Sequence, residues 1–176
     1  MTDPSIRTER LVLRPWTPAH LSEFHAIWSD PEVAWWGPTK DLDASRRLLD
    51  QIVAENASLT AGLAWYAVTG VATAEVLGNV MLRPAPYAPG EIDVGWMLAR
   101  AQWGAGLATE AVGAALARAF AVGSFDRVVA VIVPGNGRSV RVARRLGFAR
   151  VGTAMHAGLE HDLFAITRES LASASS

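Results

Sequence analysis

The sequence predicts a single α+β domain: a mixed, mostly antiparallel twisted sheet with one parallel pair of central strands, flanked by helices. Three strand-like segments, at 64–68, 76–82 and 91–98, are joined by short turns and indicate an antiparallel meander. A helical pattern at 106–122 then leads to an unbroken apolar run at 128–133, which is typical of a strand buried on both faces. Strand, helix and strand in this order form a crossover unit, so the strands at 91–98 and 128–133 should run parallel.

Two helices are expected near the amino terminus, after a first strand at 8–16. The first begins at Pro18, a residue suited to the first turn of a helix, and ends before Pro31. The second begins near Asp41 or Asp43, either of which can cap it. Apolar residues recur at intervals of three and four in both segments, as they do on the buried side of a helix.

The last part of the chain completes the sheet. A helix at 137–146 precedes two further strands near 149–154 and 162–167. The final stretch, 171–176, is small and polar and is expected to form a flexible tail. Residues 1–170 are therefore predicted to form one domain.

Composition excludes several classes of protein. The 176 residues are 51% hydrophobic and 19% charged with a formal net charge of -1, which favours a packed globule over disorder and argues against a nucleic-acid binder. The absence of cysteine excludes disulfides and thiolate metal sites, and the four histidines lack a metal-ligand spacing, so no metal is expected. No apolar run reaches the length of a membrane span and the amino terminus is polar, so we expect a soluble cytoplasmic protein without a membrane partner.

A glycine-rich turn lies between a strand and an amphipathic helix, in the segment W-G-A-G-L-A-T-E-A at 103–111. Gly104 and Gly106 let the backbone bend tightly and approach a ligand closely. The first amides of the following helix lack internal partners and lie at the positive end of its dipole, so the turn suits a phosphate. The alternative interpretation is a flexible connection with a glycine helix cap.

Two familiar phosphate motifs do not fit this turn. A Walker-type loop needs G-K-[ST], whereas Leu107, Ala108 and Thr109 follow the second glycine. A dinucleotide fingerprint needs a small third residue, where Thr109 stands, and an acid at the end of the next strand. Asp126 precedes that strand and cannot reach a ribose in the usual way. A nucleotide-binding module is therefore disfavoured.

A second polar segment, V-P-G-N-G-R-S at 133–139, follows the buried strand. Asn136 stands where a helix cap belongs, and Ser139 either faces the cleft between the parallel strands or is a solvated helix serine. Arg138, Arg141 and Arg145 share one helix face, which is either solvated or attracts a phosphate.

Taken in order, these segments resemble the GNAT acetyltransferases, most closely the RimJ/RimL group that acetylates protein amino termini. The resemblance covers nearly the whole chain. It is carried by T-E-R-L-V-L-R-P at 8–15, S-D-P-E-V at 29–33, I-D-V-G-W-M-L at 92–98, the glycine turn, N-G-R-S at 136–139 and L-G-F at 146–148.

The resemblance implies that acetyl-CoA lies in a V-shaped gap between the two central parallel strands. Main-chain atoms of Met97, Leu98 and Ala99 would pair with its pantetheine arm, and Asn136 and Ser139 would lie beside the pantetheine and the thioester. The pyrophosphate would be held by amides of the turn, from Gly104, Ala105, Gly106, Leu107, Ala108 and Thr109. Members of the family often pair as homodimers.

The chain departs from the family pattern at three positions. Trp103 opens the turn where Arg or Gln is usual, and Asp93 stands where relatives often carry Glu. Ala143 replaces the tyrosine that many relatives use to protonate the departing thiolate, which leaves Ser139 for that role.

Transfer to an amine also needs a group that takes the amine proton. Glu91 and Asp93 alternate along one strand and share a face, so one of them could act as the base, or both could be rim carboxylates that hold an arginine. In the family the acceptor site is bordered by loops that here carry Trp35, Trp36 and Tyr87, although large aromatics are more often core residues.

The sequence therefore predicts an acetyl-CoA-dependent N-acetyltransferase. Its acceptor is a primary amine, either a protein N-terminal α-amine or a small-molecule amine, which attacks the thioester directly. A protein with the same fold that only senses acyl-CoA is the alternative, because the family tyrosine is missing.

Overall fold

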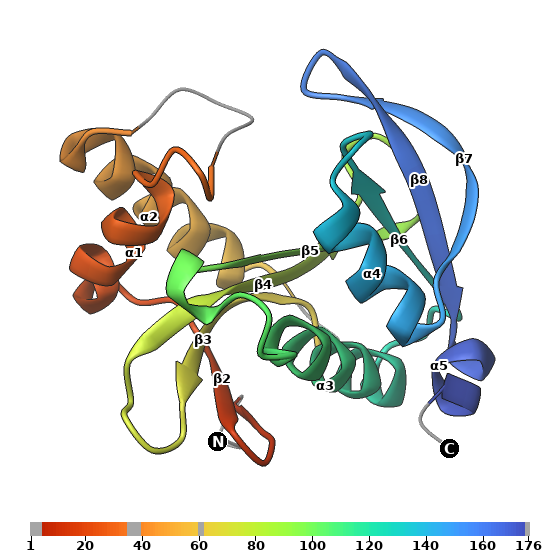
Figure 1. Ribbon diagram of the computed structural model, residues 1–176, viewed down its shortest axis with the longest axis horizontal. Coiled ribbons are helices and arrows are strands. Elements are labelled where there is room, and N and C mark those ends of the chain that lie inside the picture. The colour runs from red at the N-terminus through yellow and green to blue at the C-terminus, as the bar shows by residue number, and fades with distance from the viewer. Residues whose placement is uncertain (1–4, 35–39, 60–61, 175–176) are drawn as a thin grey trace.

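The computed structural model describes residues 5–34, 40–59 and 62–174. These residues form one sheet with the strand order β1-β2-β3-β4-β5-β6-β8-β7 (Figure 1). The strands are β1 (Ile6–Arg7), β2 (Leu11–Pro15), β3 (Ala64–Gly70), β4 (Val76–Pro84), β5 (Ile92–Leu98), β6 (Arg127–Ile132), β7 (Ala149–His156) and β8 (Leu159–Thr167). All neighbours are antiparallel except β5 and β6, which confirms the predicted fold class.

Five helices of the described residues flank this sheet: α1 (Leu21–Trp28), α2 (Leu42–Asn56), α3 (Leu107–Val122), α4 (Gly137–Leu146) and α5 (Arg168–Ala174). Short 3-10 turns at Pro18–His20 and Arg100–Gln102 precede α1 and follow β5. Asp41 caps α2, because its Oδ1 accepts a hydrogen bond of 2.7 Å from the Ala44 N–H.

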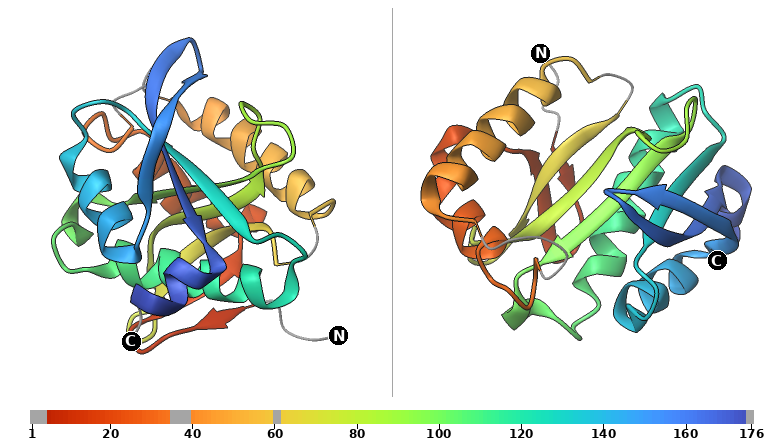
Figure 2. Two further views of the ribbon diagram at one scale, coloured as in Figure 1. Left: turned by 90° about the vertical axis from the view of Figure 1, so that its right-hand side faces the viewer. Right: turned by 90° about the horizontal axis from the view of Figure 1, so that it is seen from above.

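The two faces of the sheet carry separate apolar clusters. Phe24, Ile27 and Leu49 of α1 and α2 pack with Trp16 and Met97 on one face. The larger cluster on the other face joins α3, α4 and α5 to the inward residues of the central strands. Figure 2 shows the consequence from above: α1 and α2 lie toward one side of the molecule, and the hairpin of β7 and β8 toward the other.

Two elements differ from the expectation. β1 forms a short hairpin with β2 and was not predicted, because a strand of two residues is too short to show an alternating pattern. The predicted tail is wrong over its first residues, since 168–174 form α5 and Leu171 is only 8% exposed. Arg168 ties this helix to the end of α3 by donating to Asp126 Oδ1 at 3.3 Å and to the Phe120 carbonyl. In the described part of the chain, no helix is long and apolar enough to cross a membrane.

Candidate functional site

The site begins where the parallel strands part. β5 and β6 pair only through Ile92 with Val128 and Asp93 with Val129, so β5 continues from Val94 without β6 beside it. A cleft of about 220 Å³ opens at this point. Its lining comes from β5 (Trp96, Met97, Leu98), from the α1–α2 connection (Glu32, Val33), from the turn and α3 (Gln102, Trp103, Gly104, Gly106, Leu107, Ala108, Thr109) and from α4 (Asn136, Arg138, Ser139, Arg141, Val142, Arg145).

The start of α3 presents free amides to this cleft. Gly104 and Gly106 have φ of +82° and +79°, in the left-handed region that glycine occupies without strain. No side chain of the described residues caps the helix, and the first helical bond runs from the Glu110 N–H to the Gly106 carbonyl. The amides of Leu107, Ala108 and Thr109 therefore lack helical partners at the positive end of the dipole.

One further polar atom at the start of α3 has no hydrogen-bond partner among the described residues. Thr109 Oγ1 is buried and has no hydrogen-bond partner in the described structure. Because buried polar groups are normally paired, an unpaired hydroxyl beside three free amides fits a phosphate oxygen.

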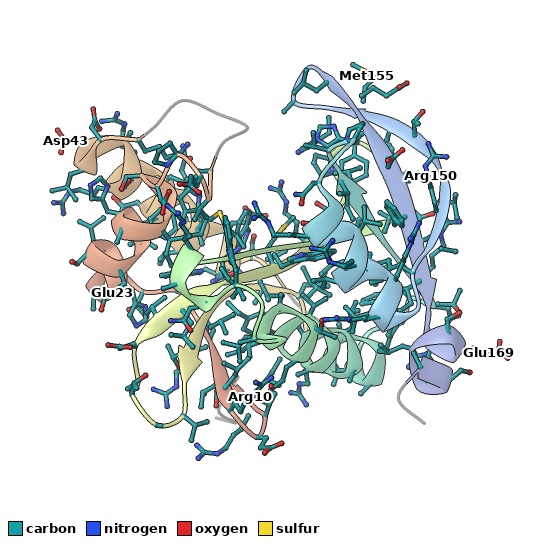
Figure 3. The ribbon with its side chains drawn as sticks, in the orientation of Figure 1. Arg10, Glu23, Asp43, Arg150, Met155 and Glu169 are labelled. Atoms are coloured by element: carbon teal, nitrogen blue, oxygen red, sulfur yellow. The ribbon has the colours of Figure 1, made fainter. Side chains whose placement is uncertain are left out.

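The glycine turn is also held by Arg10, a residue that lies outside the cleft and was not a predicted site residue. Arg10, which Figure 3 labels below α3, donates from Nε to Glu110 Oε2 at 2.6 Å and from Nη1 to the Ala105 carbonyl at 3.0 Å. Burial alone would raise the pKa of Glu110, but hydrogen bonds from Thr8 and Arg10 outweigh it and lower that pKa. The glycine turn is thus held by a charged pair that is formed outside the cleft.

The opposite wall of the cleft is basic. Arg138, Arg141 and Arg145 line it from α4, and the Arg138 guanidinium stacks over the Trp103 ring at 3.9 Å. Trp103, which departs from the usual residue of the turn, supports a cation in this way. The predicted arginine face is therefore turned to the cleft.

The two polar residues at the start of α4 have different roles. Asn136 Oδ1 accepts a hydrogen bond of 3.1 Å from the Ser139 N–H, so the amide caps the helix as its position suggests. Ser139 is half-buried and lines the cleft. Ala143, where the family tyrosine would stand, is fully buried against the sheet.

The main-chain groups of β5 differ from the expectation. The Ala99 N–H donates to the Leu77 carbonyl on β4 at 2.8 Å, so it is not free for a ligand. Because main-chain groups alternate between the two edges of a strand, Met97 also faces β4, whereas Trp96 and Leu98 face the gap. The Leu98 carbonyl already accepts a hydrogen bond of 2.9 Å from the Trp103 indole. Sequence spacing could not determine this phase, since it depends on the register with β4.

Asp93 lies at the point where the strands part, on the sheet face that carries α1 and α2. Only 2% of it is exposed, and its Oδ1 accepts a hydrogen bond of 2.6 Å from the Tyr87 hydroxyl. Burial raises the pKa of Asp93 to about 6, against smaller lowering effects of the Tyr87 hydrogen bond and of Arg83. A carboxyl with this pKa is ionised near pH 7 and can still accept a proton.

The other predicted residues lie as follows. Glu91 pairs with Arg127 at 3.7 Å, at the closed end of the strand pair, so it is a rim carboxylate. Tyr87 touches Asp93 and stacks edge-on against His156 at 5.2 Å, and burial raises its pKa further above the usual range. Trp35 and Trp36 lie outside the described residues. Among the described residues, no group of three or more His, Asp or Glu side chains could hold a metal ion.

Known proteins share both the sequence pattern and the fold. A family model, the acetyltransferase (GNAT) domain, matches residues 10–149. The uncharacterized N-acetyltransferase p20 of Bacillus licheniformis is 28% identical over 151 residues, which are 84% of each chain. An acetyltransferase of Agrobacterium tumefaciens str. C58 has 25% identity and a TM-score of 0.80 over 96% of both chains.

A third relative is known with a ligand. Mycobacterium smegmatis RimJ in complex with CoA-disulfide has 19% identity and a TM-score of 0.75, over 95% of this chain and 87% of its own. At this identity it supports the fold alone. The family match covers most of the chain and includes the glycine turn and the start of α4. The chain therefore belongs to the GNAT acetyltransferase family.

Proposed function

We propose that the protein transfers the acetyl group of acetyl-CoA to a primary amine. The observation that carries this proposal is the start of α3, where unpaired amides and the buried Thr109 hydroxyl line a cleft between two diverging strands. These groups suit a diphosphate, and the gap beyond them is open to a pantetheine arm along Trp96 and Leu98. When bound, acetyl-CoA supplies the activated acyl group.

The basic wall supports a cofactor that carries several phosphates. Arg138, Arg141 and Arg145 would each attract the 3′-phosphate or the pyrophosphate, and their charge would make binding salt-dependent. We assign coenzyme A binding to these arginines in addition to the amides of the turn.

In the proposed reaction Asp93 takes the proton of the attacking amine, directly or through a water molecule. The nitrogen forms the new amide bond to the acetyl carbon while the carbon–sulfur bond breaks, and the departing thiolate then takes up a proton. Ser139 lines the cleft and would donate a hydrogen bond to the sulfur. A thiol with a pKa near 8.5 leaves with little acid help, so the absence of a tyrosine at Ala143 does not prevent the step.

The assignment within the family is also a proposal. We infer that the protein is a cytoplasmic member of the RimJ/RimL group, on the motifs of the amino-terminal strand and of the glycine turn. Its acceptor would be a peptide α-amine or a small amine that enters from the face of α1 and α2, near Tyr87, and the family resemblance assigns Trp35 and Trp36 to the same acceptor site. A homodimer, which is frequent in the family, would leave this chemistry unchanged.

A sensor that binds acyl-CoA without transferring it is the second candidate, because α4 holds no tyrosine to protonate a thiolate. Two measurements decide between them. Melting in the presence of acetyl-CoA, coenzyme A or ATP tests binding, and we expect only the first two to raise the melting temperature. Release of free thiol with a panel of amines tests transfer. If coenzyme A binds but no amine releases thiol, the acyl-CoA sensor is supported. A larger rise of the melting temperature with ATP would contradict both candidate functions.

A further inference from the structure

Arg83 lies in a partly buried position and has no hydrogen-bond partner among the described residues. It lies on β4 directly opposite Asp93 of β5, so both side chains project from the face that carries α1 and α2. Its side chain is 25% exposed, and its Nε is buried with no partner. The nearest carboxylate, Glu55, is 3.8 Å from Nη1, which is beyond hydrogen-bond distance.

Three more exposed arginines of the described residues are better paired. Arg10, Arg150 and Arg168 each donate at least one hydrogen bond from the guanidinium, although their side chains are more exposed than that of Arg83. A guanidinium that is drawn out of water normally gains charge-assisted hydrogen bonds in return. Arg83 lacks them, and this deficit points to a partner that arrives with the substrate.

A second unused donor lies beside it. The Arg83 guanidinium sits over the Trp65 ring at 5.2 Å, and the Trp65 indole N–H is also buried without a partner. The aromatic ring holds the guanidinium in place, and Glu55 limits its movement from the α2 side. Both unsatisfied groups are donors, so the missing partner is an acceptor.

The opposite charge stands close by but is not joined to Arg83. Arg83 and Asp93 are cross-strand neighbours, yet the described structure places no ion pair of 4.0 Å or less between them. Asp93 is held instead by the Tyr87 hydroxyl. A cation and an anion that project from the same face of the sheet without a direct ion pair suit a ligand that carries both charges.

We propose that Arg83 binds a carboxylate of the acceptor, so that the amine substrate is a small amino acid-like zwitterion. This inference rests on the proposed function. The ammonium group would lie toward Asp93, which takes its proton, and the carboxylate would lie on the guanidinium fork.

The remaining ionisable neighbours agree with this assignment. His156 of β7 packs on Tyr87, and burial, helped by His161 and Arg83, lowers the pKa of its imidazole, which is therefore neutral near pH 7. Glu91 is engaged by Arg127 at the closed end of the strands. Arg83 is thus the cation opposite Asp93 on β4, and its ion pair with Glu55, at 3.8 Å, leaves its hydrogen-bond donors open to an anion.

The test compares matched acceptors. A panel of L-amino acids and the corresponding amino acid amides is assayed by thiol release at saturating acetyl-CoA, and kcat/KM is compared within each pair. The amide has the more easily deprotonated amine, so intrinsic reactivity favours it. We expect the best acceptor to be an acid that exceeds its amide at least about tenfold, the factor that corresponds to one moderately strong contact.

Three variants assign this preference to Arg83. Arg83→Gln is expected to raise KM for the acid about tenfold or more and to leave the amide within a few-fold, because only the carboxylate loses its partner. Arg83→Lys keeps the charge without the fork and should fall between Gln and wild type. Arg118→Gln, an exposed arginine of α3 on the opposite sheet face, should keep the wild-type preference.

The outcomes separate this inference from the proposed function. Two results would overturn the carboxylate subsite and leave acetyl transfer in place. One is an equal kcat/KM for amides or peptides and for acids, and the other is a preference for acids that persists in Arg83→Gln. If no amine releases thiol, titration of an amino acid into the protein saturated with coenzyme A still tests the subsite, which predicts binding that Arg83→Gln abolishes. If the melting curve shows that Arg83→Gln does not fold, the test uses Arg83→Lys alone. An unchanged preference for acids over amides in Arg83→Lys would contradict binding of the carboxylate by the guanidinium.

Discussion

At the scale of single residues, Asp93 combines burial with one strong hydrogen bond, and the two act on its pKa in opposite directions. Burial raises the pKa from 3.8 to about 6, whereas the Tyr87 hydroxyl stabilises the ionised form. The carboxyl must be ionised to accept a proton, so activity should rise as the pH rises through about 6. Asp93→Asn removes the proposed base, and we expect turnover at pH 8 to fall by roughly 10²–10⁴, as measured by thiol release.

A stability measurement shows whether this loss reflects chemistry or unfolding. Because folding raises the pKa of Asp93, the folded state prefers the protonated form, and stability from this group is lost as the pH rises from about 4 through 6. Asp93→Asn avoids that loss and keeps an oxygen for Tyr87. The variant should melt at or above the wild-type temperature at pH 8, and the difference should shrink toward pH 4. A variant that melts well below wild type at pH 8 would make its inactivity uninformative about the base.

Tyr87 provides a second residue-scale prediction. Tyr87→Phe removes the hydrogen bond that lowers the pKa of Asp93, so the acidic limb of the kcat profile should move to higher pH while turnover on the alkaline plateau stays within a few-fold. Wild type and variant are compared with the same acceptor, so the titration of the acceptor cancels. A uniform loss of activity at every pH, with no shift of the limb, would show that Tyr87 acts only by packing.

Residues of this site were predictable from the sequence to different degrees. Alternation along one strand placed Asp93 among the candidate bases, but it could not separate Asp93 from Glu91, since the choice depends on where β5 and β6 part. The partner role of Tyr87 and the position of Arg83 depend on the β4–β5 turn and register, which no single-strand pattern contains. Arg10 acts on a turn ninety-five residues away, at Ala105, and left no local signal.

At the scale of elements, the turn before α3 owes its shape to glycines in the left-handed region. Gly106→Ala keeps space for the methyl group, whose nearest neighbour would be Arg10 Nη2 at 3.7 Å, but φ of +79° is unfavourable for alanine. We expect a loss of about 1 kcal/mol in the free energy of unfolding by urea, together with about tenfold weaker binding of coenzyme A. Binding weakens because the backbone relaxes away from the strained φ and changes the direction of the N–H groups.

A matched glycine separates these two effects. Gly158, in the turn between β7 and β8, has the same φ of +79°, and a methyl group at its position would have no atom within 4 Å. Gly158→Ala should lose similar stability and bind coenzyme A as wild type does in a calorimetric titration. Equal weakening of coenzyme A binding in both variants would mean that the turn before α3 does not direct the ligand.

The carboxyl-terminal helix shows where composition misleads. The stretch 171–176 is small and polar and predicted a tail, yet Leu171 is 8% exposed and belongs to the apolar cluster with α3 and α4. One buried leucine and the Arg168 contacts are enough to dock a short helix, although seven residues carry too little periodicity to reveal it. Leu171→Ala should lower the free energy of unfolding by about 2 kcal/mol in urea with unchanged thiol release. A loss below about 0.5 kcal/mol would show that α5 contributes little to stability.

At the scale of the whole molecule, hydrophobic periodicity predicted nearly every strand and helix, and the crossover rule predicted the parallel pair. Periodicity says which residues face a core, but it does not say how far two strands stay together. The opening after Asp93 depends on the packing of α3 and α4, which fill the larger cluster on one face, and this packing is a property of the assembled sheet. Residues that line the cleft could therefore be predicted by motif, whereas the contacts of Asp93, Tyr87 and Arg83 could not.

This architecture leads to a last prediction about exchange of backbone hydrogens. The sheet consists of β1–β5 and of β6, β8 and β7, joined within the described residues by two β5–β6 residue pairs and by the helices on the faces. Amides that point into the opening, at Trp96 and Leu98, and those at the start of α3 lack strand or helix partners, so they should exchange fast without ligand. Coenzyme A that spans the opening should slow both groups together and raise the stability of the domain as a whole, by about 2.7 kcal/mol at a hundred times its Kd. Hydrogen exchange with and without coenzyme A measures this directly. Slowing restricted to the start of α3, with exchange at Trp96 and Leu98 unchanged, would mean that the diphosphate binds but the pantetheine arm lies elsewhere. The proposed position of the thioester near Asp93 would then be wrong.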